Sequence, residues 1–160
     1  MIPLRYIDQK YGFILRIPDW WRPYVIVRKW GKSGDSAYSV QFLFKYKGIV
    51  YTDIFTLSVY RMSPQQWRRE GYDDSPLVLV ASRNGRLFAY STPGEPPAIF
   101  FDESSKDGFN PKYRRPLNLL KRMINMDVPK IAKTIQFVKG KPRKGLAPMN
   151  KLTTICRYFR

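Results

Sequence analysis

Hydrophobic and polar positions alternate along the first part of the chain, with the period of two that predicts β-strands. We expect four strands, over residues 12–17, 24–30, 37–46 and 49–61. The first strand stops at Pro18, which has no backbone N–H to donate to a sheet. The last strand carries apolar residues on both of its faces, which is typical of a central strand covered on both sides.

Residues 63–71 predict a short helix that Ser63 caps and Gly71 ends. Pro64 suits the first helical position, and Gln66 lies where a capping box with Ser63 would need it. The pair Asn84-Gly85 is the strongest short hairpin signal in the chain. It predicts a hairpin between strands over residues 77–82 and 86–92.

Residues 93–111 are rich in Pro, Gly, Asp and Ser and predict the longest loop. Apolar residues then recur at helical spacing, which predicts the main helix over residues 111–126. Pro129 is expected to restart a short helix over residues 128–134, before a last strand over residues 134–138. Beyond it, residues 139–160 predict a mobile basic tail.

Charge is the least ordinary property of the chain, which carries 29 Lys and Arg against 12 Asp and Glu, a net charge of +17. Residues 1–111 hold 15 basic and 11 acidic groups, whereas residues 112–160 hold 14 basic groups and only one acid, Asp127. A field of this sign attracts polyanions such as nucleic acid, anionic lipid headgroups or acidic polymers. It can also simply keep the chain soluble.

Composition places the chain among single globular domains, since 160 residues that are 44% hydrophobic can build one sizeable core. No apolar run is long enough for a transmembrane helix, and the first ten residues lack a secretory signal. We therefore expect a cytoplasmic protein, or an extracytoplasmic one from which a signal has been removed. The single cysteine, Cys156, excludes an internal disulfide framework.

The absence of histidine narrows the chemistry that the chain can perform. It removes the Ser-His-Asp triad and the commonest transition-metal ligand, and it leaves Cys156 without an activating imidazole. The chain has no glycine-rich phosphate loop, no recognisable cofactor motif and too few thiols for a zinc site. We predict that the protein is not an enzyme and needs no cofactor.

Acidic residues offer two further interpretations. The segment 102–107 resembles a calcium loop faintly, but Lys106 interrupts it and the closing Glu is missing, which favours a solvated loop. Paired carboxylates could also serve glycoside hydrolysis, which only their separation in space decides.

Aromatic residues near the N-terminus suggest a nucleic-acid interface as an alternative. Single-strand binders combine cations with aromatic platforms, each stacked base contributing about 1–3 kcal/mol. Trp20, Trp21 and Trp30 could supply such platforms beside Arg22 and Arg28. Aromatics at strand spacing are more often core residues, so we interpret these indoles as structural.

Three short motifs resemble the PsbP-like superfamily. They are "YGFILRIPDWW" near the N-terminus, "GRLFAYSTPGEPP" in the second hairpin strand and "MDVPKIAKTIQFV" at the end of the helical region. They span residues 10–138 in the same order as in that superfamily. The resemblance implies an α/β/α sandwich, in which helices flank a central antiparallel β-sheet, as one domain over residues 1–138.

Members of that superfamily include extrinsic subunits of photosystem II, a Ran-GTPase-binding relative and bacterial proteins that are often exported lipoproteins. Their characterised members bind partners or assist assembly, and catalysis is not typical of them. The strongly basic C-terminal third of this chain departs from the pattern, and no functional residue can be transferred.

We therefore predict a non-catalytic binding or assembly module that recognises an acidic protein or an envelope polyanion. Peripheral contact with an anionic membrane, through the basic tail, is a further possibility. The candidate contacts are cations of the main helix and the tail: Arg114, Arg115, Lys121, Arg122, Lys139, Lys141, Arg143 and Lys144.

Overall fold

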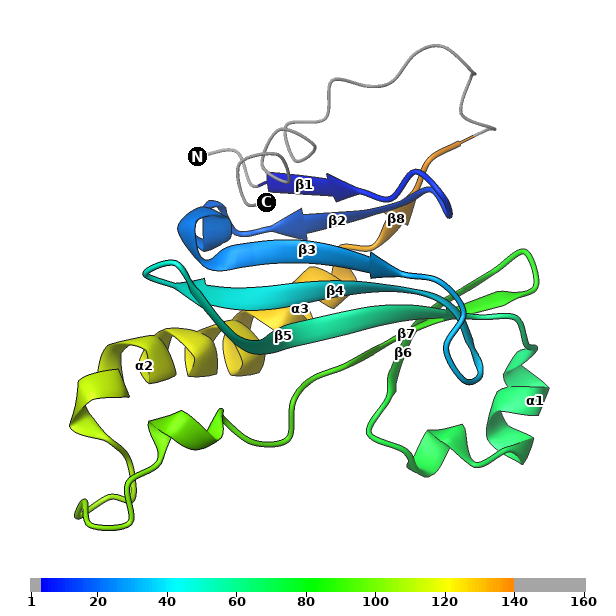
Figure 1. Cartoon of the computed structure of the whole chain (residues 1–160). Helices are drawn as coiled ribbons and strands as arrows, with labels where there is room; N and C mark the ends of the chain where they lie inside the picture. Colours follow the sequence, from blue (N-terminus) through cyan, green and yellow to red (C-terminus); the bar gives the residue numbers. More distant parts are fainter. Residues whose placement is uncertain (1–3, 140–160) are drawn as a thin grey trace.

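Two antiparallel sheets organise the protein, whose computed structural model describes residues 4–139 (Figure 1). The smaller sheet has the order β1-β2-β8 and the larger the order β3-β4-β5-β7-β6. The strands of the smaller sheet are β1 (Leu4–Ile7), β2 (Phe13–Ile17) and β8 (Gln136–Phe137). Those of the larger sheet are β3 (Val25–Trp30), β4 (Ser36–Tyr46), β5 (Ile49–Tyr60), β6 (Val78–Arg83) and β7 (Arg86–Ser91).

The four expected N-terminal strands and the predicted hairpin are thus confirmed, and β1 is an additional strand that was not predicted. Between β2 and β3 the chain crosses from one sheet to the other through a 3-10 turn, η1 (Asp19–Tyr24). The hairpin β6–β7 turns at Asn84 and Gly85, whose positive φ angles of 51° and 72° are those of the tight turn that the pair predicts.

The strand β5 is central in its sheet, as predicted, but its two faces do not alternate strictly. Ile54 and Phe55 are both buried in the main core, although they are neighbours in the sequence. A register shift between Phe42 and Leu43 of β4 explains this, because Phe42 pairs with Phe55 whereas Leu43 pairs with Asp53. A bulge of this kind interrupts the alternation, so two successive side chains of the bulged strand can lie on the same face.

Helical residues 114–133 cover one face of the larger sheet (Figure 1). They form α2 (Arg114–Arg122), a π-helical turn η5 (Met123–Asp127) and α3 (Val128–Lys133) in unbroken succession. The sequence predicted a break here and a restart at Pro129. The helix instead continues through one wider π turn. Pro129 has no N–H to donate, and its ring would clash with the carbonyl of Asn125, four positions earlier, so a regular α-helical turn cannot form here.

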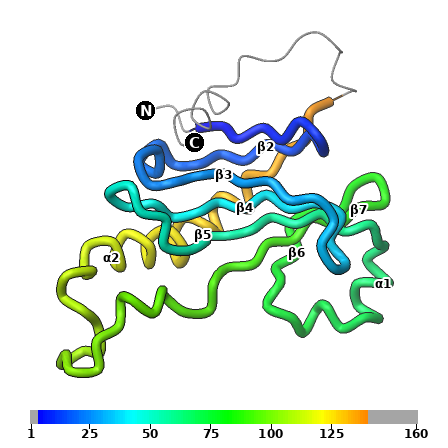
Figure 2. Tube along the Cα trace, in the orientation of Figure 1, coloured from blue at the N-terminus to red at the C-terminus, as the bar shows by residue number. Residues whose placement is uncertain are grey.

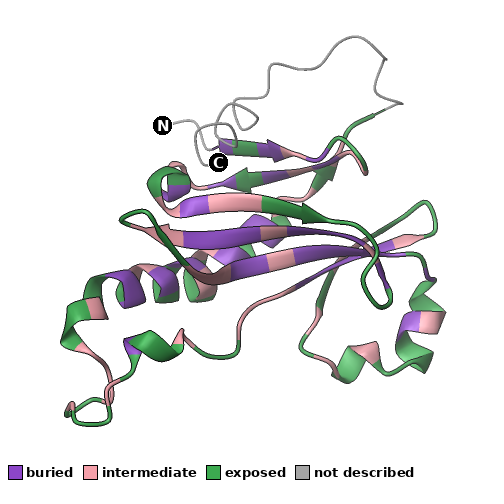
Figure 3. Cartoon of the chain, viewed as in Figure 1, coloured by how far each residue is buried: buried purple, intermediate pink, exposed green. Residues whose placement is uncertain are grey.

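The main core lies between these helices and the two sheets, and its buried residues are among those coloured purple in Figure 3. Leu117, Leu120 and Met123 supply its helical side, and Val40 and Phe42 are among the residues of its sheet side. The first 3-10 turn adds Trp21, which is fully buried.

A second, smaller cluster lies on the opposite face of the larger sheet, under α1 (Pro64–Arg69). Tyr60, Leu87 and Ala89 of the sheet pack there against Trp67. Their sequence neighbours Val59 and Phe88 belong to the main core, and successive residues of a strand point to opposite faces. The class is therefore mixed α+β with antiparallel sheets, and among the described residues a helix covers the second face only at one end.

The start of α1 follows its sequence signals, with one correction. The Ser63 hydroxyl accepts a hydrogen bond of 3.1 Å from the backbone N–H of Gln66, and Gly71 follows the helix with a φ of 80°. The side chain of Gln66 does not reach back to complete a capping box. It donates instead to Glu70 at 2.8 Å, which is the next turn of the helix.

The predicted long loop is confirmed as an irregular segment with two short 3-10 turns, η3 (Ala98–Phe100) and η4 (Pro111–Tyr113). In the tube view it leaves the sheet and extends past the N-terminal end of α2 (Figure 2). An isolated bridge between Phe101 and Phe109 closes its tip, and the two rings stack at a centroid distance of 5.3 Å. The loop thus delivers the chain to the start of α2.

Candidate functional site

Cations gather on the exposed side of α2, where they line an open hollow of about 520 Å³. Its basic lining consists of Lys112, Arg114, Arg115 and Arg122, which we call the α2 basic face. Pro111, Asn118 and Leu119 are the other described residues that line it, and no carboxylate is among the described lining residues. The hollow therefore presents one sign of charge to solvent.

Helical geometry explains why these residues share a side. Leu117 and Leu120 turn into the core, so Arg115, Asn118 and Arg122, at spacings of three and four, lie on the outer surface. The turn before α2 adds Lys112, three residues ahead of Arg115. This residue was missed by the sequence interpretation, although the same spacing would have indicated it.

One of these cations has an internal partner. The guanidinium of Arg114 donates to Asp107 at 2.8 Å, from the tip of the preceding loop. The Ser105 hydroxyl and this guanidinium both donate to the Asp107 carboxylate, which lowers its pKa to about 2. Arg115, by contrast, forms no hydrogen bond or ion pair with any residue between positions 4 and 139. It is the cation of the group that is best placed to meet a partner.

Arg122 is held by an indole at the far end of the face. Its guanidinium carbon lies 4.4 Å from the ring centroid of Trp20, a cation–π contact that fixes the side chain over η1. The neighbouring Trp21 is buried, and its Nε1 donates to the Asp127 carboxylate of η5 at 2.8 Å. These two contacts attach the helical layer to the crossover between the sheets.

The remaining predicted contacts lie elsewhere. Lys121 is not part of the hollow, and its ammonium lies 4.6 Å from the ring centroid of Phe109. Lys139 is exposed beyond β8. Lys141, Arg143 and Lys144 lie outside the described residues. The structure thus brings together three of the predicted cations, Arg114, Arg115 and Arg122.

The three indoles of the nucleic-acid alternative do not form one platform. Trp21 has no exposed surface on which a base could stack, and Trp20 is half-buried under Arg122. Trp30 is 52% exposed at the end of β3, and its Nε1 donates to Gln41 at 3.2 Å. It pairs in register with Ser39, on the face of the sheet away from the main core.

Two carboxylates of the acidic loop, those of Asp102 and Asp107, accept hydrogen bonds from neighbouring donors. Asp102 accepts hydrogen bonds from the backbone N–H and the hydroxyl of Ser104, which lower its pKa. Asp107 accepts from Ser105, from the Phe109 backbone and from Arg114. Within the part of the chain that the structure describes, no three acidic, Cys or His side chains come close enough to hold a metal ion.

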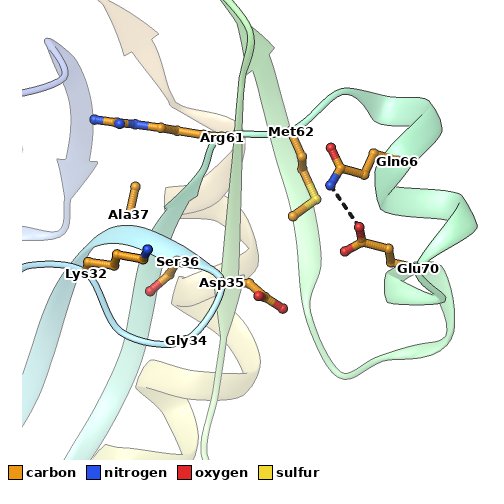
Figure 4. A pocket seen from close by; sticks show the side chains of 9 residues that line it. All are labelled: Lys32, Gly34, Asp35, Ser36, Ala37, Arg61, Met62, Gln66 and Glu70. Atoms are coloured by element: carbon orange, nitrogen blue, oxygen red, sulfur yellow. Dashed lines mark hydrogen bonds between the residues drawn. The ribbon is translucent and has the colours of Figure 1, made fainter.

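A second hollow lies between the β3–β4 loop and α1 (Figure 4). It measures about 370 Å³ and is lined by both signs of charge, Lys32 and Arg61 against Asp35 and Glu70. Asp35 accepts a hydrogen bond from the hydroxyl of Tyr72, and Glu70 accepts one from Gln66. A mixed lining selects neither anions nor cations, so this hollow is a weaker candidate than the α2 basic face.

Comparison with protein-family models, with curated proteins and with solved structures finds no match to this chain. Each helix between residues 4 and 139 is too short or too polar to cross a bilayer.

Proposed function

We propose that the protein is a non-catalytic binding or assembly module that recognises an acidic partner, a protein or an envelope polyanion, through the α2 basic face. One observation carries this proposal: three cations named from the sequence, together with Lys112, line a single hollow, and none of its lining residues between positions 4 and 139 is acidic. The cations of residues 139–160 would extend the contact. The partner would be bound chiefly by charge, with little shape selection in so open a hollow.

The expected energetics suit such a role. Exposed ion pairs contribute only about 0.2–1 kcal/mol each, so several are needed for useful affinity. A field of one sign also speeds the encounter with a partner of opposite sign, an effect that salt screens. The net charge of +17 supplies that field. Recognition of this kind is fast and depends strongly on ionic strength.

The proposal extends to the family of the fold. We infer a PsbP-like domain with an α/β/α arrangement, supported by the order of the quoted motifs and by helices on both faces of the larger sheet. Binding and assembly are the roles that this kinship implies. The lack of histidine in the whole sequence excludes histidine-based acid–base catalysis, which supports a non-catalytic role.

The direct test is binding of fluorescently labelled poly-glutamate, measured by anisotropy at low ionic strength. We expect the double variant Lys112→Gln/Arg115→Gln to bind between about 2-fold and 30-fold more weakly, because two exposed charge contacts are lost. The matched control is Arg68→Gln/Arg69→Gln, which removes the same charge from the exposed side of another helix, α1. Equal losses in both variants would show that net charge, and not the α2 basic face, determines binding.

Single-stranded nucleic acid is a second candidate, favoured by the exposure of Trp30 beside Arg28 and Lys29 on β3. It predicts that an oligonucleotide quenches tryptophan fluorescence and that Trp30→Ala removes most of the quenching. Binding of poly-glutamate would be unaffected by that substitution. Trp30→Ala should therefore weaken the response to an oligonucleotide if the second candidate is right, and it should leave the binding of poly-glutamate unchanged if the first is right.

A further inference from the structure

A small polar cavity lies at the other end of the molecule, where the β6–β7 hairpin meets the β1–β2 turn and β8. Figures 1 and 2 place this hairpin at the end of the sheet remote from the start of α2. The cavity measures about 110 Å³, and its polar lining is Lys10, Arg83, Asn84 and Arg86. Tyr11, Phe88 and Phe137 form its apolar walls, and within the described part of the chain no carboxylate lines it.

The hairpin itself brings two of these cations face to face. Arg83 and Arg86 are direct cross-strand partners on either side of the Asn84-Gly85 turn. Like charges directly opposite each other destabilise a β-pair. A tight turn fixes their register, so the repulsion cannot be relieved by slippage. An anion between the two guanidinium groups would remove this cost.

Aromatic rings orient all three cations. The guanidinium carbon of Arg86 lies 5.2 Å from the ring centroid of Tyr11, and that of Arg83 lies 4.7 Å from the ring centroid of Phe137. The ammonium of Lys10 lies 5.1 Å from the ring centroid of Tyr38. The face of an aromatic ring holds a cation in place, but it does not accept the N–H groups that point outward in the plane of a guanidinium. Those donors therefore still need an acceptor.

One hydrogen-bond donor of this cluster, the Nε of Arg86, is buried without an acceptor among the described residues. A buried donor without a partner costs about 1–3 kcal/mol, so such groups in folded proteins usually indicate a missing ligand or water. None of the three cations forms a salt bridge with a residue between positions 4 and 139.

Asp8, which accepts from the backbone of the lining residue Tyr11, does not neutralise these cations. Asp8 is fully buried, and its two oxygens already accept from the backbone N–H of Tyr11 at 2.7 Å and from the Tyr38 hydroxyl at 2.6 Å. Its charge is thus satisfied by neutral donors and not by the cations outside. The cationic cavity thus has no acidic partner among residues 4–139.

We propose that this cavity, the β6–β7 anion site, binds one tetrahedral oxyanion, a phosphate ion or the terminal phosphoryl group of a larger ligand. Arg83 and Arg86 supply planar donors that match two oxygens of such an anion, and Lys10 adds a third charge. The volume of about 110 Å³ suits a single phosphoryl group and is too small to enclose a whole nucleotide. The site is separate from the α2 basic face and does not depend on its function.

The test is calorimetric titration of the full chain with inorganic phosphate, at an ionic strength held constant with chloride. We expect saturable binding of one phosphate, weakened at least tenfold by Arg86→Gln. Arg83→Gln, at an exposed position, should weaken it as well and guards against a folding defect in the first variant. Arg115→Gln on the α2 basic face is the control that should bind phosphate as the native chain does.

Phenyl phosphate distinguishes the two sources of the anion. If it binds as tightly as inorganic phosphate, the site takes the phosphoryl group of a larger ligand. If inorganic phosphate alone binds, the site encloses the free ion. Failure to bind either one, or binding that both Arg86→Gln and Arg83→Gln leave intact, would overturn the proposal.

Discussion

Asp8 shows at the level of a residue how the fold tolerates a buried charge. Three donors point at its carboxylate: the hydroxyls of Tyr6 and Tyr38 at 3.3 and 2.6 Å, and the Tyr11 backbone N–H at 2.7 Å. The three link β1, the turn after it and β4. Desolvation is offset by hydrogen bonding here, as a buried carboxylate requires.

Replacement of Tyr38 by Phe should therefore destabilise the protein by more than the loss of one hydroxyl suggests. It removes the shortest of the three hydrogen bonds and leaves the carboxylate under-solvated, at a cost of about 1.5–3 kcal/mol in the free energy of unfolding. Urea denaturation measures the change. Tyr24→Phe is the control, because that half-buried ring forms no hydrogen bond within the described residues. Equal effects of the two substitutions would contradict this account of Asp8.

Tyrosine ionisation predicts a loss of stability at high pH. The hydrogen bond to Asp35 is the largest of the effects that raise the pKa of Tyr72 to about 12, and burial raises the pKa of Tyr38 well above its usual range. Because the fold favours the neutral phenol, the stabilisation is complete below the unfolded pKa of about 10 and is lost as the pH rises through 12. The free energy of unfolding should therefore fall between pH 10 and 12.

The variant Tyr72→Phe isolates one of these groups. In urea denaturations, its free energy of unfolding should fall less steeply between pH 10 and 12. Its tyrosinate absorbance should show one fewer phenol that ionises at high pH. An unchanged slope in this variant would refute the assignment of the effect to the Tyr72–Asp35 contact.

The sequence predicts that α2 carries cations on its outer surface, but it predicts only in part where each of their side chains points. Helical spacing groups Arg115 with Arg122, and it would also have added Lys112. What spacing cannot show is which cation meets an aromatic ring from a distant segment. Lys121 lies over Phe109 of the loop, and Arg122 lies over Trp20 of η1. These contacts depend on tertiary structure.

At the level of elements, the strands and their turns follow local signals closely, whereas the ends of the fold do not. β1 was missed although Leu4 and Tyr6 are buried and Arg5 between them is exposed. Four residues are too few for alternation to stand out, and the strand forms because β2 offers it an edge. Pairing partners of this kind are not visible in a local pattern.

The π turn in the helical layer has a function in the fold that can be tested. It places Asp127 where its carboxylate accepts the indole N–H of Trp21, a fully buried side chain. Asp127→Ala should lower the free energy of unfolding by about 1.5–3 kcal/mol, because a hydrogen bond to a charged acceptor is lost and a buried donor is left alone. Thermal and urea denaturation measure the loss.

The matched control for that substitution is Asp73→Ala, which removes an exposed carboxylate from a 3-10 turn. It should change the stability by less than about 0.5 kcal/mol. If Asp127→Ala proves equally harmless, η5 does not anchor the helices to the crossover.

For the whole molecule, the sequence predicts the mixed class. The resemblance implies antiparallel pairing in one central sheet, whereas the structure has two antiparallel sheets. The sequence does not predict how far each face of the sheet is covered. Ser39 and Ser58 on the second face share a hydrogen bond of 2.7 Å. Small polar residues of this kind need no helix above them, so α1 covers only the end that carries Tyr60 and Leu87. The alternation of apolar and polar residues cannot show whether a helix covers the polar face of a sheet or whether its polar side chains hydrogen-bond to one another.

Salt dependence is the prediction that belongs to the molecule as a whole. Because screening shortens the range of the +17 field to about 10 Å at 0.1 M salt, the affinity for poly-glutamate should fall steeply with ionic strength. Plotted against the logarithm of salt concentration, the affinity of Lys112→Gln/Arg115→Gln should fall with a shallower slope than that of the native chain. Arg68→Gln/Arg69→Gln should retain the native slope. Identical slopes in the two double variants would place the contact elsewhere.

The most direct test of the proposed function is to locate the bound polyanion by NMR. Backbone amide shifts of the full chain are followed while poly-glutamate is added. We predict that the largest changes fall on residues 111–122, around the α2 basic face. Changes centred on Trp30 and its neighbours on β3, with the amides of α2 unmoved, would contradict the account.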